Sequence, residues 1–252
     1  MIYIGGYMAD TEALRLQIPR GIERLIFDKL ANGAGRYSYA NEEELYFEIR
    51  LRAEIINAAR EQSRSGLRFS TFRDARVNPA YWEKTREGGF LLKRGVSAAV
   101  AITDIFRNGP MYATECATAI VIIYYKALLN IYKPGLFDRV FTNIELMNWH
   151  YLHRNLREIG DMVRAADFIP GDRRYFMNPD VNPLTPELQG ENVIDMSGGY
   201  YYGHDLGITS ASEIIKFLNE NRKEGATRSA YLMDLVGRPN FKRLGNIYFS
   251  NR

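Results

Sequence analysis

The sequence predicts an α+β fold, in which helices come first, an antiparallel sheet follows and a helix closes the chain. Two observations carry this prediction. Apolar residues recur at helical spacing within residues 41–66 and 97–131, whereas from residue 140 onward the period changes to two. Helices and strands that are segregated along a chain are typical of α+β proteins rather than of alternating α/β folds.

The first long helix is predicted to begin at Asn41 and to end at Gly66. Asn41 and Glu44 have the form of a capping box, and Gly66 can adopt the left-handed conformation that ends a helix. Apolar side chains line one face of this segment. They are Leu45, Ile49, Leu51, Ile55, Ile56 and Ala59. After an irregular aromatic stretch, residues 82–92 are predicted to form a hairpin that turns at residues 87–89.

Two further helices are expected in close succession. Ser97 caps a short helix, which Asn108-Gly109-Pro110 ends, with Gly109 expected in a left-handed cap. The next helix extends to about Ile131, and its residues 117–129 are almost all apolar. A helix that is apolar on all sides should lie buried at the centre of the fold.

The second half of the chain is predicted to form the sheet. Strands are expected at residues 141–147 and 174–177, and a hairpin at residues 191–196 and 200–206. Ser210 and Glu213 then form a capping box, which opens a closing helix that we expect to reach Gly225.

Composition indicates a single soluble domain over residues 1–252. The chain has no linker, repeat or low-complexity tract, and its net charge of +3 with no basic stripe argues against a nucleic-acid binder. The most apolar run, residues 117–125, is far shorter than the ~20 residues that cross a bilayer, so we expect no membrane partner. The N-terminus lacks the features of a signal peptide, and one cysteine allows no internal disulfide, as is typical of a reducing compartment.

No metal or other cofactor is expected. His150 and His153 are spaced like a pair of metal ligands, but no companion cysteine or histidine set accompanies them, so a surface pair is the better interpretation. The sequence also contains no EF-hand loop or other calcium pattern.

The single cysteine, Cys116, is the candidate nucleophile. It lies early in the most apolar helix, where the partial positive charge of a helix N-terminus favours a thiolate. This effect is strong if Thr114 is the N-cap and weak if the helix starts at Pro110. The alternative is a buried structural thiol, which the surrounding alanine and isoleucine residues favour when Cys116 is considered alone. Glu115 adds a carboxylate directly before Cys116.

His204 and Glu191 are the candidate partners of the thiol. If Ser197-Gly198 forms a two-residue turn, Glu191 lies directly opposite His204, and a four-residue loop gives the same register. A Gly198-Gly199 turn would instead place Val193 opposite His204. Cross-strand pairs of glutamate and histidine also occur on protein surfaces without any catalytic role. The pairing therefore indicates an active site only in combination with Cys116.

Cysteine acyl transfer needs a thiolate, a group that holds its proton and a third group that orients the second. A cysteine on a central helix, packed against an antiparallel sheet that carries a histidine, is the papain-like (NlpC/P60-like) arrangement. Cys116, Glu191 and His204 occur in the corresponding order, and Glu115 is a second acid. Which of these groups is the main acid or base stays open at this point.

Long motifs carry a family resemblance. They are Asn108-Gly109-Pro110, Glu115-Cys116-Ala117-Thr118-Ala119-Ile120-Val121-Ile122-Ile123-Tyr124-Tyr125, Trp149-His150-Tyr151, Gly171-Asp172 with Tyr175-Phe176, Asn178-Pro179, Gly190-Glu191-Asn192-Val193-Ile194, His204 with Leu206-Gly207-Ile208, and Ser229-Ala230-Tyr231-Leu232. These runs resemble the bacterial spore-coat transglutaminases, the protein-glutamine gamma-glutamyltransferases of spore-forming bacteria. The resemblance extends over most of the chain after residue 41, whereas residues 1–40 match only loosely and are treated as an N-terminal extension.

The resemblance implies an activity and a set of catalytic residues. It implies that the chain joins glutamine and lysine side chains of proteins through a thioester on Cys116, with Glu191, His204 and Glu115 around it. The implied partners are spore coat proteins, and the implied location is the cytoplasm of the sporulating mother cell and the spore coat.

Aromatic residues are expected to form a water-poor approach to the thioester, because water competes with lysine there. Phe69 and Trp149 match aromatics that lie near the site in the family, and Tyr201 is a third candidate for this substrate-binding wall. Two departures from the family pattern bear on the site. Glu187-Leu188-Gln189 stands where the family often carries a tryptophan, and Asp205 replaces a glycine and adds a charge beside His204.

Two alternatives use the same observations. A cysteine peptidase or amidase would employ the same residues but release its product to water. A non-catalytic coat scaffold protein would need Cys116 only for stability, although the lack of repeats and low complexity weighs against it.

Overall fold

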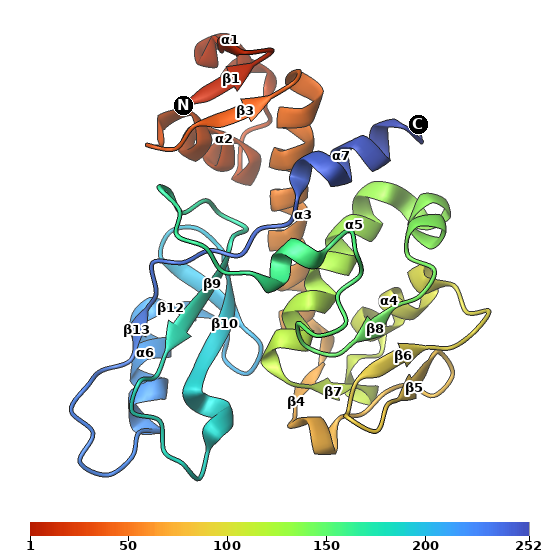
Figure 1. Ribbon diagram of the computed structural model, residues 1–252, viewed down its shortest axis with the longest axis vertical. Coiled ribbons are helices and arrows are strands. Elements are labelled where there is room, and N and C mark those ends of the chain that lie inside the picture. The colour runs from red at the N-terminus through yellow and green to blue at the C-terminus, as the bar shows by residue number, and fades with distance from the viewer. Residues whose placement is uncertain (252) are drawn as a thin grey trace.

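The computed structural model describes residues 1–251, and it places one buried helix at the centre of the fold (Figure 1). This helix, α5 (Cys116–Val140), packs against α3 (Glu42–Ser65) and α4 (Ala98–Arg107), and against a five-stranded antiparallel sheet. The predicted α+β fold, with a buried central helix that carries Cys116 on an antiparallel sheet, is confirmed.

The five-stranded sheet has helices on both faces. Its order is β12-β11-β10-β9-β13, with every neighbouring pair antiparallel. The strands are β9 (Arg173–Met177), β10 (Gly190–Asp195), β11 (Tyr200–Gly203), β12 (Gly207–Ser210) and β13 (Tyr231–Leu232). Because strand side chains alternate between faces, Ile194 and Tyr202 join the main core around α5, whereas Val193 and Tyr201 pack with α6 (Ala211–Glu220) on the other face.

Two small sheets lie beside the first half of α5. One contains β5 (Trp82–Lys84), β6 (Phe90–Leu92) and β8 (Glu145–Leu146), and it includes the predicted hairpin. The other pairs β4 (Arg68–Phe69) in parallel with β7 (Ala113–Thr114), directly before the start of α5. This second pair brings Phe69 alongside Thr114, two residues from Cys116.

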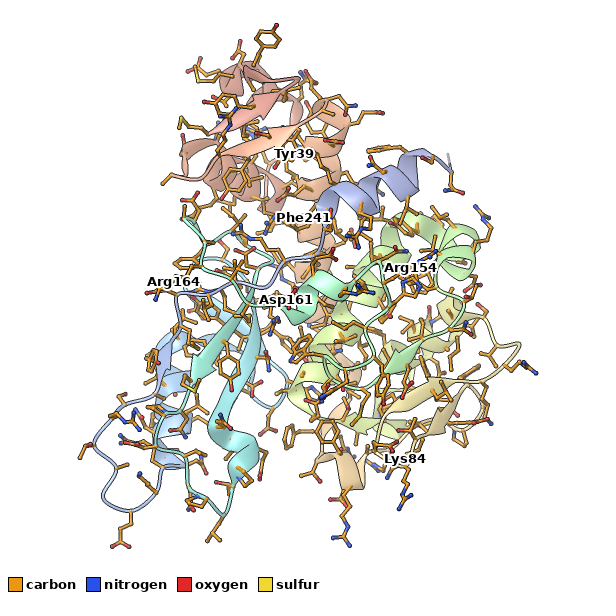
Figure 2. The ribbon with its side chains drawn as sticks, in the orientation of Figure 1. Tyr39, Lys84, Arg154, Asp161, Arg164 and Phe241 are labelled. Atoms are coloured by element: carbon orange, nitrogen blue, oxygen red, sulfur yellow. The ribbon has the colours of Figure 1, made fainter. Side chains whose placement is uncertain are left out.

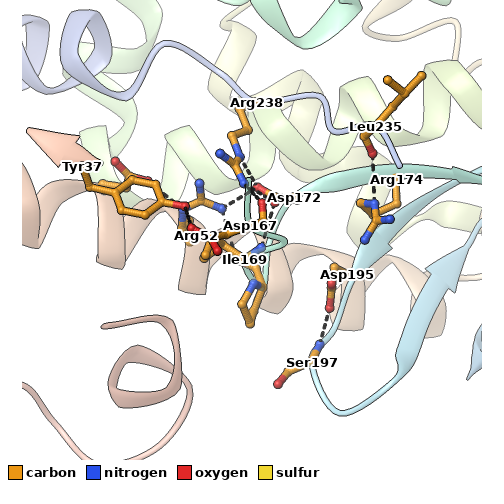
Figure 3. Close-up of polar contacts among 12 residues, drawn as sticks. Tyr37, Arg52, Asp167, Ile169, Asp172, Arg174, Asp195, Ser197, Leu235 and Arg238 are labelled. Carbon is orange, nitrogen blue, oxygen red and sulfur yellow. Dashed lines mark hydrogen bonds and ion pairs between the residues drawn. The ribbon is translucent and has the colours of Figure 1, made fainter. Parts of the chain in front are cut away.

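Residues 1–40 form secondary structure of their own above the sheet in Figure 1. The elements are β1 (Ile2–Ile4), β2 (Tyr7–Met8), α1 (Thr11–Gln17), α2 (Ile22–Asn32) and β3 (Tyr37–Tyr39). Asp167 ties this unit to the segment before β9, because its carboxylate accepts hydrogen bonds from the amides of Ala34 and Gly35 and from the Tyr37 hydroxyl (Figure 3).

A buried ionic network fixes the start of β9 to α3 and to the C-terminal segment. Asp172, which is fully buried, receives hydrogen bonds from Arg52 of α3 at 2.7 Å and from Arg238 at 2.7 Å (Figure 3). Arg52 also donates to Glu48 at 2.8 Å, so two guanidinium groups and two carboxylates neutralise one another. The chain then enters α7 (Phe241–Phe249), which packs on α3.

The local chemistry of the helix ends agrees in large part with the sequence. Asn41 caps α3 and Ser97 caps α4, and Gly66 takes the left-handed conformation (φ 81°) that ends α3. Gly109 differs from the expectation, because its backbone is not left-handed. A Cβ there would lie 2.2 Å from the carbonyl oxygen of Ser65, so glycine is needed for close approach of two chain segments.

Two other expectations need correction. The strand predicted over residues 141–147 is wrong, since only Glu145–Leu146 pairs in a sheet. The helix predicted to reach Gly225 ends at Glu220, where Asn221 leaves the helical conformation. By length and hydropathy α5 could cross a membrane, but it is largely buried within the protein, and Lys133, in a non-helical conformation before Pro134, interrupts it.

The hairpin of β10 and β11 has a different register from the one expected. Its loop contains three residues, Ser197-Gly198-Gly199, all with positive φ. Val193 therefore faces Gly203, and one more step along the strands places Asn192, not Glu191, beside His204. Hairpin loops of two or four residues place Glu191 opposite His204, whereas the observed loop of three residues shifts the pairing by one position. The predicted neighbour of His204 is therefore off by one residue.

Candidate active site

Cys116 is the first residue of α5, and Glu115 is the N-cap of that helix. The Glu115 carboxylate accepts hydrogen bonds from the amides of Ala117 at 2.6 Å and Thr118 at 2.7 Å. The helix therefore starts neither after Thr114 nor at Pro110, but Cys116 does lie in its first turn. Both oxygens of Glu115 are engaged with helix amides, which is the ordinary task of an N-cap.

The surroundings of Cys116 favour the thiol over the thiolate. Burial raises the pKa of the Cys116 thiol well above its usual value, and the negative charges of Glu191 and Glu115 raise it further. A hydrogen bond from Asn192 opposes this rise in pKa. The helix N-terminus would favour a thiolate, but its capping carboxylate offsets that effect. To act as a nucleophile, Cys116 would therefore need a nearby group that takes its proton.

Asn192 makes direct contact with the sulfur. Its side-chain amide Nδ2 donates to Cys116 Sγ at 3.7 Å, and its Oδ1 accepts from Nη1 of Arg173 at 2.9 Å. The sequence reasoning did not identify Asn192 as a site residue. A three-residue loop at Ser197-Gly198-Gly199, where two glycines and a serine can take positive φ, would have placed it beside His204.

Glu191 is a buried carboxyl group whose charge acts on the Cys116 thiol. Burial raises the pKa of Glu191 to about 8, the charges of Asp205 and Glu115 add to this, and a hydrogen bond from the backbone amide of His204 at 3.1 Å opposes it. Gly203 makes this position possible, because a Cβ there would lie 3.0 Å from the Glu191 carboxylate oxygen. A group with a pKa near neutrality can both accept and donate a proton under ordinary conditions.

His204 lies near the start of α5, where its ring faces backbone carbonyl groups. Its Nε2 lies 3.2 Å from the carbonyl oxygen of Arg68, and the Thr114 carbonyl also contacts the ring. Burial lowers the pKa of His204 more than these carbonyls raise it, so the imidazole is neutral. The predicted contact between the imidazole and the Glu191 carboxylate is not present, since that carboxylate accepts from the His204 backbone amide instead.

Two of the three predicted aromatic residues lie around the site. Phe69 packs near the His204 ring, with centroids 6.3 Å apart. Trp149 stacks on the Arg173 guanidinium, whose carbon lies 4.2 Å from the ring centroid. The loop that carries Trp149 is attached to α5, because the amide of Asn148 donates to Thr118 Oγ1 at 2.8 Å.

The structure does not bring Tyr201 to Cys116. Its ring packs edge-on against Phe176, with centroids 5.4 Å apart, on the sheet face that α6 covers. Tyr175 is a residue near the site that the sequence reasoning missed. Burial raises its pKa to about 12, and the charges of Cys116 and Glu191 contribute, so the Tyr175 hydroxyl lies within electrostatic range of the nucleophile.

Within residues 1–251, no group of three or more His, Cys, Asp or Glu side chains is arranged to hold a metal ion. His150 is exposed, and its ring contacts the side chain of Asn148. His153 packs against Phe141, with ring centroids 4.9 Å apart.

Comparison with known proteins agrees with this geometry. The family model described as protein-glutamine gamma-glutamyltransferase matches residues 1–248, including the N-terminal forty. A protein-glutamine gamma-glutamyltransferase of Bacillus mycoides (strain KBAB4) is 45% identical over 213 residues, which is 84% of this chain and 76% of the relative. One of Bacillus cereus (strain B4264) is 44% identical over the same shares.

A solved structure is also similar. It is described as a transglutaminase from Geobacillus stearothermophilus without its C-terminal extension, and it aligns with a TM-score of 0.78 at 44% sequence identity. The alignment covers 82% of this chain and 98% of that one.

Proposed function

Because the chain belongs to the protein-glutamine gamma-glutamyltransferase family and is a crosslinking transglutaminase, we propose that Cys116 is its nucleophile and that Glu191 moves the protons. One observation carries this proposal: burial raises the pKa of the Glu191 carboxyl group to about 8, and this group lies close enough to the Cys116 thiol for its charge to raise the pKa of the thiol. Neither group alone suits acyl transfer, but together they can exchange a proton near neutral pH.

The first half of the reaction acylates the enzyme. The ionised Glu191 takes the proton of the Cys116 thiol, and the thiolate attacks the γ-carboxamide carbon of a protein glutamine. The carbon–nitrogen bond breaks as the nitrogen takes a proton from Glu191, and ammonia leaves. A γ-glutamyl thioester on Cys116 remains.

The second half transfers the acyl group to lysine. Glu191, again a carboxylate, takes one proton from the lysine ε-ammonium, because an ammonium is not a nucleophile. The amine attacks the thioester carbon and the carbon–sulfur bond breaks. The nitrogen loses its surplus proton to the sulfur, which leaves an isopeptide bond and the Cys116 thiol. Glu191 then releases the proton that it took from lysine to solvent or to the departing ammonia, which restores the carboxylate for the next cycle.

His204 and Glu115 take supporting roles in this scheme. His204 holds Glu191 through its backbone amide and links the hairpin to β4 and β7 through its ring. Glu115 caps the helix that presents Cys116. Their contacts support roles in orientation rather than in proton transfer.

Selection of lysine over water would come from the surroundings of the thioester. Phe69 and Trp149 lie on two sides of the site, through their contacts with His204 and Arg173. Apolar rings at this position limit access of water and favour an incoming amine. This distinguishes the transglutaminase from a cysteine hydrolase built on the same scaffold.

We further propose that the substrates are spore coat proteins and that the protein acts in the sporulating mother cell and the spore coat, without calcium. The resemblance to the spore-coat transglutaminases supports the first two points, and the absence of an EF-hand loop from the sequence supports the third. Loss of ε-(γ-glutamyl)lysine crosslinks from coat extracts of spores that lack the gene would support this location, whereas an unchanged crosslink content would contradict it.

The activity test measures incorporation of a fluorescent primary amine into a glutamine-bearing protein in the presence of a chelator. Cys116→Ala should abolish incorporation while leaving the thermal unfolding midpoint close to that of the parent. Ammonia release is measured with and without added amine, because a hydrolase would release ammonia without forming the amine adduct. Full incorporation by Cys116→Ala would refute the assignment of the nucleophile.

A further inference from the structure

Arg173 is a buried cation beside the active site. Within residues 1–251 it forms no salt bridge, although the charge of Asp161 acts on it from a greater distance. It is the first residue of β9 and is 2% exposed. Its guanidinium donates to three neutral oxygens: Oδ1 of Asn192 and the backbone carbonyls of Gly160 and Asp161. Asp161 lies between the sheet and α5 in Figure 2. Burial of a charge without a carboxylate at salt-bridge distance is unfavourable, so a function would explain its position.

The reason lies in the orientation of the Asn192 amide. An asparagine amide can turn over and exchange its oxygen with its nitrogen, and the neighbours decide which end faces which way. A guanidinium group can only donate, so it requires Oδ1 of Asn192 on its side. The donor Nδ2 of Asn192 then faces Cys116 Sγ, at 3.7 Å. A hydrogen-bond donor that points at the sulfur favours the thiolate over the thiol.

The guanidinium itself is held from two sides. Trp149 covers one face, at 4.2 Å from the guanidinium carbon to the ring centroid. Gly237 lies close to the guanidinium and also bridges to the Arg173 backbone, and a Cβ on Gly237 would lie 2.6 Å from Nε of Arg173. These two contacts restrict movement of the guanidinium.

We propose that Arg173 is a positioning residue, which acts on Cys116 through Asn192 by fixing the amide with its donor toward the sulfur and by placing a positive charge behind it. This rests on the assignment of Cys116 as the nucleophile. It also gives Trp149 a second role, because the ring that flanks the site clamps the cation that orients Asn192. The hydrogen bond from Asn192 to a charged sulfur would then be stronger than to a neutral one.

The chain supplies a matched control in the next residue. Arg174 is also buried, at 3% exposed, its guanidinium lies 3.6 Å from the Phe168 ring centroid, and it donates to the carbonyls of Leu235 and Met233 (Figure 3). It points to the other face of the sheet, since neighbouring strand residues alternate. Arg174→Gln therefore reproduces the loss of a buried, stacked arginine without touching Asn192.

The measurement is the rate at which iodoacetamide alkylates Cys116 between pH 6 and 9. The chain has one cysteine, so every alkylation reports on this sulfur. The titratable groups that act on it are Glu115, Glu191, Tyr175 and Arg173. Glu115, Glu191 and Tyr175 are present in both the Arg173 and the Arg174 variants. A difference in alkylation rate between these two variants at a given pH therefore reports the loss of the Arg173 guanidinium.

We expect Arg173→Gln to slow alkylation roughly tenfold, as loss of one hydrogen bond to a charged group would, and Arg174→Gln to remain within about twofold of the parent. Arg173→Lys, which keeps the charge but not the planar fork, should fall between them. In an Asn192→Ala background, Arg173→Gln should have less than about a threefold further effect, because the two residues act in series.

Two outcomes would overturn the proposal: a parental alkylation rate in Arg173→Gln, or the full tenfold loss in the Asn192→Ala background. If Arg173→Gln does not fold, Arg173→Lys carries the test, and a parental rate in that variant counts against the proposal. Alkylation does not require turnover, so these results are separate from amine incorporation by Cys116→Ala, which tests the proposed function.

Discussion

Replacement of Glu191 by glutamine should stabilise the folded protein at high pH and abolish its activity. The pKa of Glu191 rises from 4.5 to about 8 on folding, mainly because the carboxyl group is buried. Below pH 4.5 both the folded and the unfolded chain hold the proton. Between pH 4.5 and 8 the unfolded chain loses it while the folded protein keeps it, so the free energy of unfolding falls as pH rises. Above pH 8 both states have lost the proton, and the free energy of unfolding falls no further on this account.

The size of this effect follows from the two pKa values. One pH unit corresponds to about 1.36 kcal/mol, so the buried carboxylate destabilises the folded protein by at most about 5 kcal/mol above pH 8. Glutamine has nearly the same shape, stays neutral, and its carbonyl can still accept from the His204 amide. Glu191→Gln should therefore be close to the parent in stability near pH 5 and clearly more stable near pH 9, while amine incorporation is lost.

Urea unfolding at pH 5, 7 and 9, with a reductant present, measures the first effect, and incorporation of a fluorescent amine measures the second. Glu220→Gln is the matched control, because Glu220 is exposed at the end of α6 and should change neither quantity. A stability difference between Glu191→Gln and the parent that does not grow with pH would refute the buried-carboxyl argument. Equal turnover in the Glu191 and Glu220 variants would refute the proposed proton transfer.

Two further variants examine the other acidic residues of the site. Glu115→Ala should lower the free energy of unfolding by about 1 kcal/mol through loss of the N-cap, and should lower the pKa of Cys116 because a neighbouring negative charge is removed. Glu115→Ser should recover the stability but not the original pKa, as measured by urea unfolding and by alkylation against pH, and a failure of serine to restore stability would argue against the capping role. Asp205→Asn should move the acidic limb of the pH–rate profile for amine incorporation to lower pH, because the Asp205 charge raises the pKa of Glu191. Asp205 is exposed, so the shift of the acidic limb should vanish at about 1 M salt. A shift that persists at this salt concentration would mean that a structural change, and not the lost charge, is responsible.

Helices with clear end signals could be predicted from sequence. The caps at Asn41, Ser97 and Ser210 all accept the expected backbone hydrogen bonds, because capping depends on residues within one turn. The segment around residues 141–147 failed for the opposite reason. Alternating apolar residues there are buried against α5 and its neighbours, but only Glu145–Leu146 finds a partner strand. Strand pairing depends on distant parts of the chain, which local pattern does not contain.

The candidate site was predicted in its components but not in its contacts. Sequence reasoning selected Cys116, Glu191 and His204, and the structure brings all three to the start of α5. It missed Asn192, because an expected even-numbered hairpin loop shifted the pairing by one residue. Tyr201 was selected for its aromatic character, but strand alternation places it on the opposite face of the sheet.

By itself, the sequence determined the candidate nucleophile, the central helix that carries it and the family whose motifs surround it. These features depend on residue identity and on short-range spacing, both of which can be read directly from the sequence. Only the tertiary structure decided what surrounds the sulfur: Glu115 caps the helix, His204 faces two carbonyl groups, and Arg173 turns the Asn192 amide toward Cys116. Such contacts join residues up to 136 positions apart, and a one-residue change in register or the flip of one amide reverses them.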